Sequence, residues 1–120
     1  MMHGLETELK DIVLSNTSFG PEEIKLVINR ISDDYSQFSQ LKELTGELAR
    51  QDNRTPATSV RLGVCQYLLG SYSDAVNTLG NAEGGALSQF YMGKANQSLG
   101  HHDQAIACFE AAKTAGYDGD

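Results

Sequence analysis

The sequence predicts an all-α protein, and three observations support this prediction. Apolar side chains recur at helical spacing along most of the chain. The pairs Leu69-Gly70 and Leu99-Gly100 are typical of helix ends, because glycine is the usual residue just past a helix. A shift of 30 residues also aligns the two segments that carry these pairs, which indicates an internal repeat.

Composition and charge are those of an ordinary globular domain spanning residues 1–120. Hydrophobic residues make up 40% of the chain and charged residues 21%. The formal net charge is −7 and lysine and arginine form no cluster, so we expect neither a nucleic acid nor a membrane as partner. No apolar run approaches the roughly 20 residues that span a bilayer, and the N-terminus lacks a signal-peptide core. A cytoplasmic location is therefore expected.

Residues 1–55 are expected to form helices that pack against the first copy of the repeat. Pro21 lies where proline begins a helix, and Glu22 and Glu23 follow it at the positive end of the helix dipole. The chain from 21 to 50 is either one long helix or a hairpin broken at residues 32–34. Apolar residues mark a first helix near the N-terminus and a stripe after Pro21: Leu5, Leu9, Ile12 and Val13, then Ile24, Val27, Ile28, Ile31, Tyr35, Phe38, Leu41, Leu44 and Leu48.

The internal repeat places glycine, alanine and large apolar residues at matching positions of 62–82 and 92–112. It pairs Gly63 with Gly93, Gly70 with Gly100, Leu69 with Leu99, Ala75 with Ala105, Val76 with Ile106, Leu79 with Phe109 and Ala82 with Ala112. Each copy predicts two helices joined by a short turn, with the second helix beginning at Asp74 or Gln104.

Gly63 and Gly93 lie inside predicted helices, where glycine costs about 1 kcal/mol relative to alanine. We therefore expect a second helix to cross closely at each. Leucine at either position should overpack the crossing by about 1–3 kcal/mol, and alanine at Gly63 should do much less. Cys65 and Cys108 are expected to be reduced core thiols, since both sit in apolar helical patterns.

The repeated residues resemble the tetratricopeptide repeat. Its leucine-glycine pair, later glycine, alanine and large apolar residue correspond to Leu62-Gly63, Gly70, Ala75 and Leu79, and then to Met92-Gly93, Gly100, Ala105 and Phe109. The resemblance covers about half the chain, with repeats at 56–85 and 86–117, and implies a right-handed solenoid of helical hairpins. Several residues depart from the pattern: Ser59 and Gln89 replace its tryptophan, Gln66 and Asn96 its tyrosine, and Tyr117 its terminal proline.

The resemblance also implies a protein-binding face on the first helix of each repeat. Carried over by position, its residues are Val60, Val64, Tyr67, Leu68, Leu87, Phe90, Lys94 and Gln97, flanked by Ala57 and Ser98. The same face could instead be covered by the N-terminal helices. Family members that clamp a peptide carboxylate use lysine and asparagine there, whereas this chain has Val60, Val64 and Tyr91, so that function is not expected.

Catalytic, metal and cofactor sites are not expected. His101, His102 and Asp103 form the most chemical-looking cluster, but zinc usually requires three or four ligands at defined spacings. Neighbouring acids such as Asp33-Asp34 and Glu22-Glu23 do not face each other on a helix.

We therefore predict a non-catalytic scaffold that binds a peptide or partner helix. The alternatives are a self-association module, with one apolar side of the last helix left uncovered, and a regulatory domain of a larger, enzymatic protein.

Overall fold

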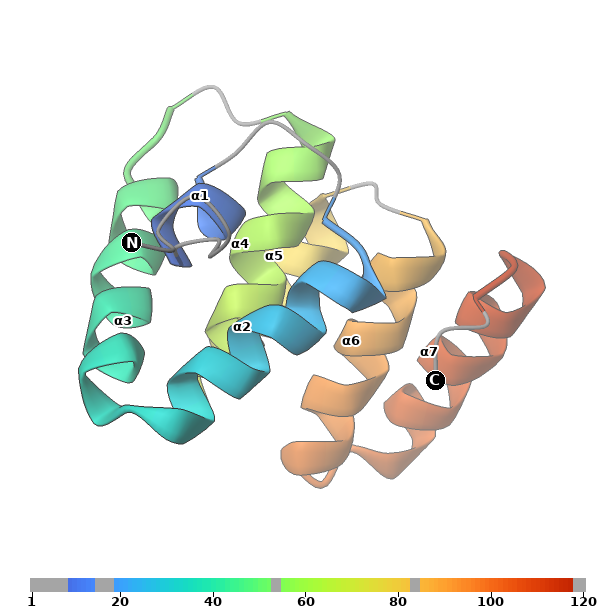
Figure 1. Cartoon of the computed structure of the whole chain (residues 1–120). Helices are drawn as coiled ribbons and strands as arrows, with labels where there is room; N and C mark the ends of the chain where they lie inside the picture. Colours follow the sequence, from blue (N-terminus) through green and yellow to red (C-terminus); the bar gives the residue numbers. More distant parts are fainter. Residues whose placement is uncertain (1–8, 15–18, 53–54, 83–84, 118–120) are drawn as a thin grey trace. The chain divides into compact units, whose positions relative to one another are not determined.

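The computed structural model describes residues 9–14, 19–52, 55–82 and 85–117. These residues form seven helices, α1 to α7, as the sequence predicted for an all-α protein (Figure 1). The chain divides into two compact units, Met1–Gln51 and Asp52–Asp120. Leu5, expected in the first helix, lies outside the described residues.

The N-terminal unit contains α1 (Leu9–Val13), α2 (Pro21–Asp33) and α3 (Tyr35–Ala49). Proline begins α2, and the Glu23 carboxylate accepts a hydrogen bond from the Gly20 N–H at 2.8 Å. This bond satisfies one of the amide groups that a helix start leaves without an intrahelical partner. The core of the unit consists of apolar side chains from all three helices: Leu9, Ile12, Val13, Ile24, Val27, Leu41, Leu44 and Leu48.

The stretch from 21 to 50 is two helices and not one, and the break falls at Asp34. This residue is extended, with φ −148° and ψ 117°, and caps α3. Its Oδ1 accepts hydrogen bonds from the Ser36 hydroxyl at 2.8 Å and the Ser36 N–H at 2.9 Å. These bonds stabilise the carboxylate, so the pKa of Asp34 is lowered from 3.8, chiefly by the hydroxyl.

The C-terminal unit consists of two helical hairpins. The first pairs α4 (Pro56–Leu68) with α5 (Tyr72–Asn81), and the second pairs α6 (Ala86–Ser98) with α7 (His102–Thr114). Helix α6 also packs against α4 and α5 (Figure 1, green to red). The buried Ser88 hydroxyl on α6 donates to the Leu79 carbonyl on α5 at 3.1 Å and thereby joins the hairpins.

Glycine ends both first helices as the sequence predicted. Gly70 and Gly100 have φ of +86° and +82°, a conformation that L side chains rarely adopt. At each end the N–H of the glycine and the N–H of the next residue donate hydrogen bonds to carbonyl groups of the last helical turn. The Ser71 N–H donates to the Gln66 carbonyl and the His101 N–H to the Asn96 carbonyl, both at 2.9 Å. This is the Schellman arrangement, which satisfies the last carbonyl groups.

The second helices begin earlier than the sequence suggested. Their first residues are Tyr72 and His102, two positions before the predicted Asp74 and Gln104. The prediction was wrong because residues 72–73 and 102–103 are polar or aromatic and continue no apolar helical pattern. The Schellman bonds complete the turn within Gly70-Ser71 and Gly100-His101, so the next residue already enters a helix.

The close crossings expected at Gly63 and Gly93 are present. A Cβ atom on Gly63 would lie 2.5 Å from both Cγ and Cδ2 of Leu79. On Gly93 it would lie 2.8 Å from Cε1 of Phe109 and 3.2 Å from Cβ of Cys108. These distances are well below ordinary carbon contacts of about 3.5–4.0 Å. Even the single methyl group of alanine at Gly63 would therefore require Leu79 to shift, and the prediction that alanine overpacks the crossing much less than leucine stays a prediction.

Both cysteines are free, with Cys65 buried and Cys108 half-buried. Among the helices described, none combines the length and the apolar character of a membrane span.

Candidate functional site

Six aromatic rings of the C-terminal unit contact one another in a continuous chain, here called the aromatic cluster. Its members come from all four helices of the unit and from the turn that follows α7: Tyr67, Tyr72, Phe90, Tyr91, Phe109 and Tyr117. Five of the six are only partly buried, and Tyr91 is 9% exposed. Tyr91 is thus the buried member of the cluster, and the other five rings are partly exposed to solvent.

The rings at the middle of the cluster meet at steep angles. Tyr67 on α4 lies 5.5 Å from Tyr91 on α6, centroid to centroid, with the ring planes 62° apart. Tyr91 lies 5.2 Å from Phe90 at 86°. Both are edge-to-face pairs, in which the positive edge of one ring meets the negative face of the other. The Tyr67–Tyr91 contact also bridges the two hairpins, so the positions of the rings are fixed by helix packing.

Phe90 is the most connected ring of the cluster. Tyr117 stacks on it with centroids 4.2 Å apart and planes 14° apart, and Phe109 lies 5.7 Å away. The Lys94 ammonium lies 5.9 Å from the Phe90 centroid, one helical turn along α6. That distance is within the range of a cation–π interaction. A positive charge is therefore held beside partly exposed aromatic surface in an acidic chain.

The four phenol groups of the cluster lie close enough to affect one another's pKa. Burial raises the pKa of Tyr91 to about 12, and the nearby phenols of Tyr117 and Tyr67 add to the shift. The pKa of Tyr67 is also raised, first by burial and then by Tyr72. The hydroxyl groups of Tyr67 and Tyr91 therefore keep their protons at neutral pH and remain hydrogen-bond donors.

The residues that the sequence assigned to a binding face differ in accessibility. Gln97 is exposed, and Val64 is fully buried and has no surface to offer a ligand. The others are partly exposed: Val60, Tyr67, Leu68, Leu87, Phe90 and Lys94. Tyr67 and Phe90, on different helices, are brought together through Tyr91.

Sequence reasoning missed the rings that complete the cluster, namely Tyr72, Tyr91, Phe109 and Tyr117, as members of one surface. A usable signal was present, because six of the nine aromatic residues in the chain follow residue 66. In the repeat pattern, Tyr117 stands out only as a departure from a terminal proline. Its stacking on Phe90 depends on the turn after α7, where Gly116 has φ +99° and reverses the chain.

His101, the first residue of the candidate histidine cluster, takes part in the turn between α6 and α7. Its Nδ1 lies 3.3 Å from Oδ1 of Asn96, whose Nδ2 donates to the Cys108 sulfur at 3.9 Å. The imidazole therefore contacts an amide and not the thiol. Within the described part of the chain, no group of three or more histidine, cysteine or acidic side chains could hold a metal ion.

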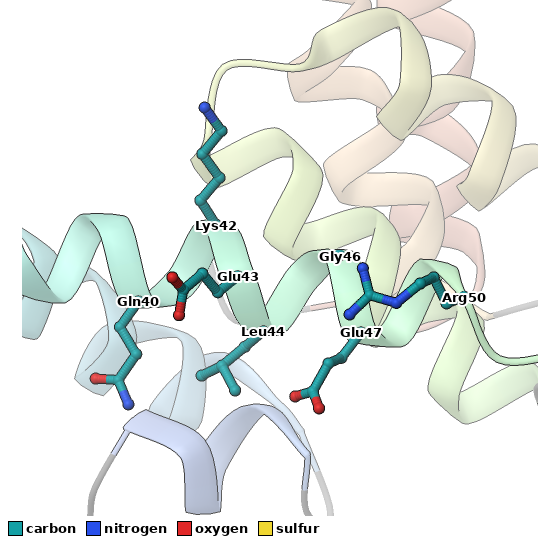
Figure 2. Close-up of a pocket in the computed structure, with 7 residues that line it drawn as sticks. All are labelled: Gln40, Lys42, Glu43, Leu44, Gly46, Glu47 and Arg50. Atoms are coloured by element: carbon teal, nitrogen blue, oxygen red, sulfur yellow. The ribbon is translucent and has the colours of Figure 1, made fainter.

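A shallow hollow of about 590 Å³ lies along α3 in the N-terminal unit. The described residues that line it all belong to one helix and its C-cap: Gln40, Lys42, Glu43, Leu44, Gly46, Glu47 and Arg50. In Figure 2 Lys42 points away from the side that Leu44 and Glu47 occupy, and the Arg50 side chain reaches back toward Gly46. Because these side chains spread over two sides of the helix, they do not converge on a bound molecule.

The described residues thus define an all-helical protein with a partly exposed aromatic cluster. The chain matches no family model, no curated protein and no solved structure. Its function is inferred below from the cluster and from the paired hairpins.

Proposed function

We propose that the chain is a non-catalytic scaffold that binds a peptide or a partner helix, and that its C-terminal unit is a tetratricopeptide-like solenoid of two repeats. The binding face is the side of α4 and α6 that carries Tyr67, Phe90 and Lys94. This assignment keeps the expected repeats at 56–85 and 86–117.

The repeat assignment is supported by equivalent features in the two hairpins. Gly63 and Gly93 meet Leu79 and Phe109, which are paired by the same shift of 30 residues. Gly70 and Gly100 have nearly the same positive φ at the two helix ends. Two copies of one sequence pattern therefore have the same two local geometries, as expected for stacked repeats.

The aromatic cluster is the observation that carries the binding proposal. Aromatic side chains dominate the energetics of interfaces, because each brings a large apolar area with little conformational entropy to lose. Tyr67 and Phe90 are partly exposed yet held by neighbouring rings. Such rings bind without first becoming ordered, which reduces the free-energy cost of association. Lys94 adds a charge that favours an acidic partner over a basic one.

A peptide selection tests the proposal directly. Displayed random peptides are selected on the full chain, and the best are measured by fluorescence anisotropy. Phe90→Ala and Tyr67→Ala should each weaken binding by about 2 kcal/mol or more. Tyr35→Ala is the matched control, because Tyr35 is 80% exposed in the N-terminal unit. Peptides whose affinity survives both substitutions, in variants that circular dichroism shows to be folded, would contradict the proposed face.

Self-association through α7 is a second candidate, and one exposed residue favours it. Ile106 on α7 is 56% exposed, whereas its repeat equivalent Val76 is half-buried. One residue argues against self-association. In the first repeat Gly80 lies beside the next helix, with its Cβ position 4.0 Å from the Met92 sulfur. The equivalent residue of α7 is Glu110, whose charged side chain a second copy packed there would have to bury. Sedimentation of the wild type and of Ile106→Lys tests this candidate. If α7 forms the interface, the wild type should form a dimer as concentration rises and the variant should stay a monomer.

A further inference from the structure

Tyr117 covers one face of the Phe90 ring. The two rings stack with their centroids 4.2 Å apart and their planes only 14° apart. The other rings that contact Phe90 meet it at steeper angles, Phe109 at 56° and Tyr91 at 86°. Among the described residues, Tyr117 is therefore the ring that lies flat on Phe90. The covered face is closed to a ligand as long as Tyr117 stays in this position.

The Tyr117 ring also lies close to the middle of the aromatic cluster. The pKa of Tyr91 is raised to about 12 first by burial and then by the nearby Tyr117 phenol. The Lys94 ammonium lies 5.9 Å from the centroid of Phe90, the ring on which Tyr117 stacks. Tyr117 thus occupies the part of the proposed binding face that combines aromatic surface with a positive charge.

Tyr117 is attached to the unit differently from the rest of the cluster. The other five rings project from helices α4 to α7, whereas Tyr117 lies in the turn after α7. In the first repeat the equivalent position is Leu87, which lies inside α6. The Tyr117 N–H donates to the Ala112 carbonyl at 2.9 Å, and Gly116 before it has φ +99°. The backbone of Tyr117 is thus fixed to the end of α7, and no helix has to move for its ring to leave Phe90.

A change of the Tyr117 side-chain rotamer is sufficient to uncover Phe90. Rotation about the Cα–Cβ bond moves the whole ring, which is partly exposed to solvent. Phe90 keeps its position when Tyr117 leaves, because Tyr91 and Phe109 still contact it. A stacked aromatic pair is favoured over separated rings by a factor of only about two to ten. The covered state is therefore the main one, and a ligand of modest affinity can displace the ring.

We propose that Tyr117 is a lid on the binding face: it stacks on Phe90 in the unliganded protein, and a bound peptide displaces it and takes its place beside Lys94. This inference rests on the proposed binding function and names how the same site is regulated. The apparent Kd of a peptide is then its intrinsic Kd divided by the fraction of molecules in which Phe90 is uncovered.

The probe is the fluorescein-labelled peptide from the display selection that loses most affinity in Phe90→Ala, and its binding to the full chain is followed by fluorescence anisotropy. Tyr117→Ala removes the lid and should tighten binding by about threefold to tenfold. Tyr117→Leu should also tighten it, and its apolar side chain keeps the contact that often accompanies a Schellman turn. Tyr72→Ala is the matched control, because it removes a cluster ring that contacts Tyr67 and should not tighten binding.

A second measurement follows the position of the lid itself by NMR. In the unliganded chain the rings of Tyr117 and Phe90 should show a nuclear Overhauser effect, since their centroids are 4.2 Å apart. Saturation with the same peptide should remove this effect. The effect between Phe90 and Tyr91 should remain, because helix packing fixes both rings.

Weaker or unchanged binding in Tyr117→Ala and Tyr117→Leu, with both variants folded by circular dichroism, would overturn the lid and leave the proposed function intact. Equal tightening by Tyr72→Ala would also overturn it, and so would a Tyr117–Phe90 effect that persists in the saturated complex. Selected peptides indifferent to Phe90 and Tyr67 would instead contradict the function itself, and the lid with it, because nothing would then compete for Phe90.

Discussion

Replacing Gly63 by alanine is the sharpest test of how the first hairpin is held together. The added methyl group would lie 2.5 Å from two carbon atoms of Leu79, which is 1% exposed. One of these atoms is Cγ, the branch point of the side chain, so a rotation of the terminal methyl groups does not relieve the clash. Either Leu79 or α5 must move by about 1 Å to reach an ordinary contact.

Two effects of opposite sign set the size of the change. Overpacking of a filled core costs about 1–3 kcal/mol. Alanine regains about 1 kcal/mol over glycine inside a helix. Gly63→Ala should therefore lower the free energy of unfolding by about 0–2 kcal/mol. The matched control is Gly80→Ala in α5, where the Cβ position meets only the Met92 sulfur at 4.0 Å. It should raise stability by about 0.5–1 kcal/mol.

The assay is urea denaturation followed by tyrosine fluorescence. The chain has no tryptophan, and four of its five tyrosines lie in the C-terminal unit, so the signal reports mainly on that unit. A double-mutant cycle with Leu79→Ala tests the contact itself. Because the smaller side chain makes room for the methyl group, the combined loss should fall short of the sum of single losses by about 0.5–3 kcal/mol.

An additive cycle would refute the close-crossing argument, and so would a Gly63→Ala variant stabilised as much as Gly80→Ala. Either result would mean that the glycine is retained for a reason other than the approach of Leu79.

Three further predictions concern backbone and titration. Gly100→Ala meets no neighbour but requires φ +82°, so it should cost about 1–2 kcal/mol in the same urea assay, and Gly100→Asn should cost less; equal, negligible losses would count against the strain. Stability should fall as pH rises from about 10 through 12, because the unfolded chain releases the Tyr91 proton first; Tyr91→Phe should flatten this fall, and an unchanged slope would contradict the buried phenol. The Asp34 carboxylate stabilises the fold at pH above its ordinary pKa of 3.8, and this stabilisation is lost as the pH falls below 3.8. Asp34→Asn should therefore remove this pH dependence from thermal melts of the N-terminal unit. A pH dependence that persists in the variant would show that another group causes it.

The sequence was sufficient to predict features that depend on spacing or on one residue type. Helix ends at Gly70 and Gly100 follow from the conformational freedom of glycine, and glycines inside predicted helices indicated close crossings at Gly63 and Gly93, whose partners Leu79 and Phe109 only the structure identifies. The apolar periodicity identified the helices of residues 21–50 but could not decide whether they were continuous. That choice depended on the capping bonds of Asp34, which compete with an uninterrupted helix.

The aromatic cluster could be predicted only in part. Tyr67 and Phe90 were predicted from the resemblance to the tetratricopeptide repeat, which implies a binding face on the first helix of each repeat. Tyr91 occupies the next position along α6 and bridges them only because the two hairpins stack. Tyr117 joins through the positive φ of Gly116, and no periodicity encodes such a reversal.

The central claim, that the aromatic cluster is the binding face, is tested most directly by ring resonances in the full chain. Protein with isotope-labelled phenylalanine and tyrosine is titrated with the tightest peptide from the display selection and followed by NMR. The ring signals of Phe90 and Tyr67 should shift with one shared dissociation constant, while Tyr35 in the other unit stays unchanged. Saturating peptide that shifts Tyr35 and Phe38 and leaves Phe90 and Tyr67 unmoved would contradict the account.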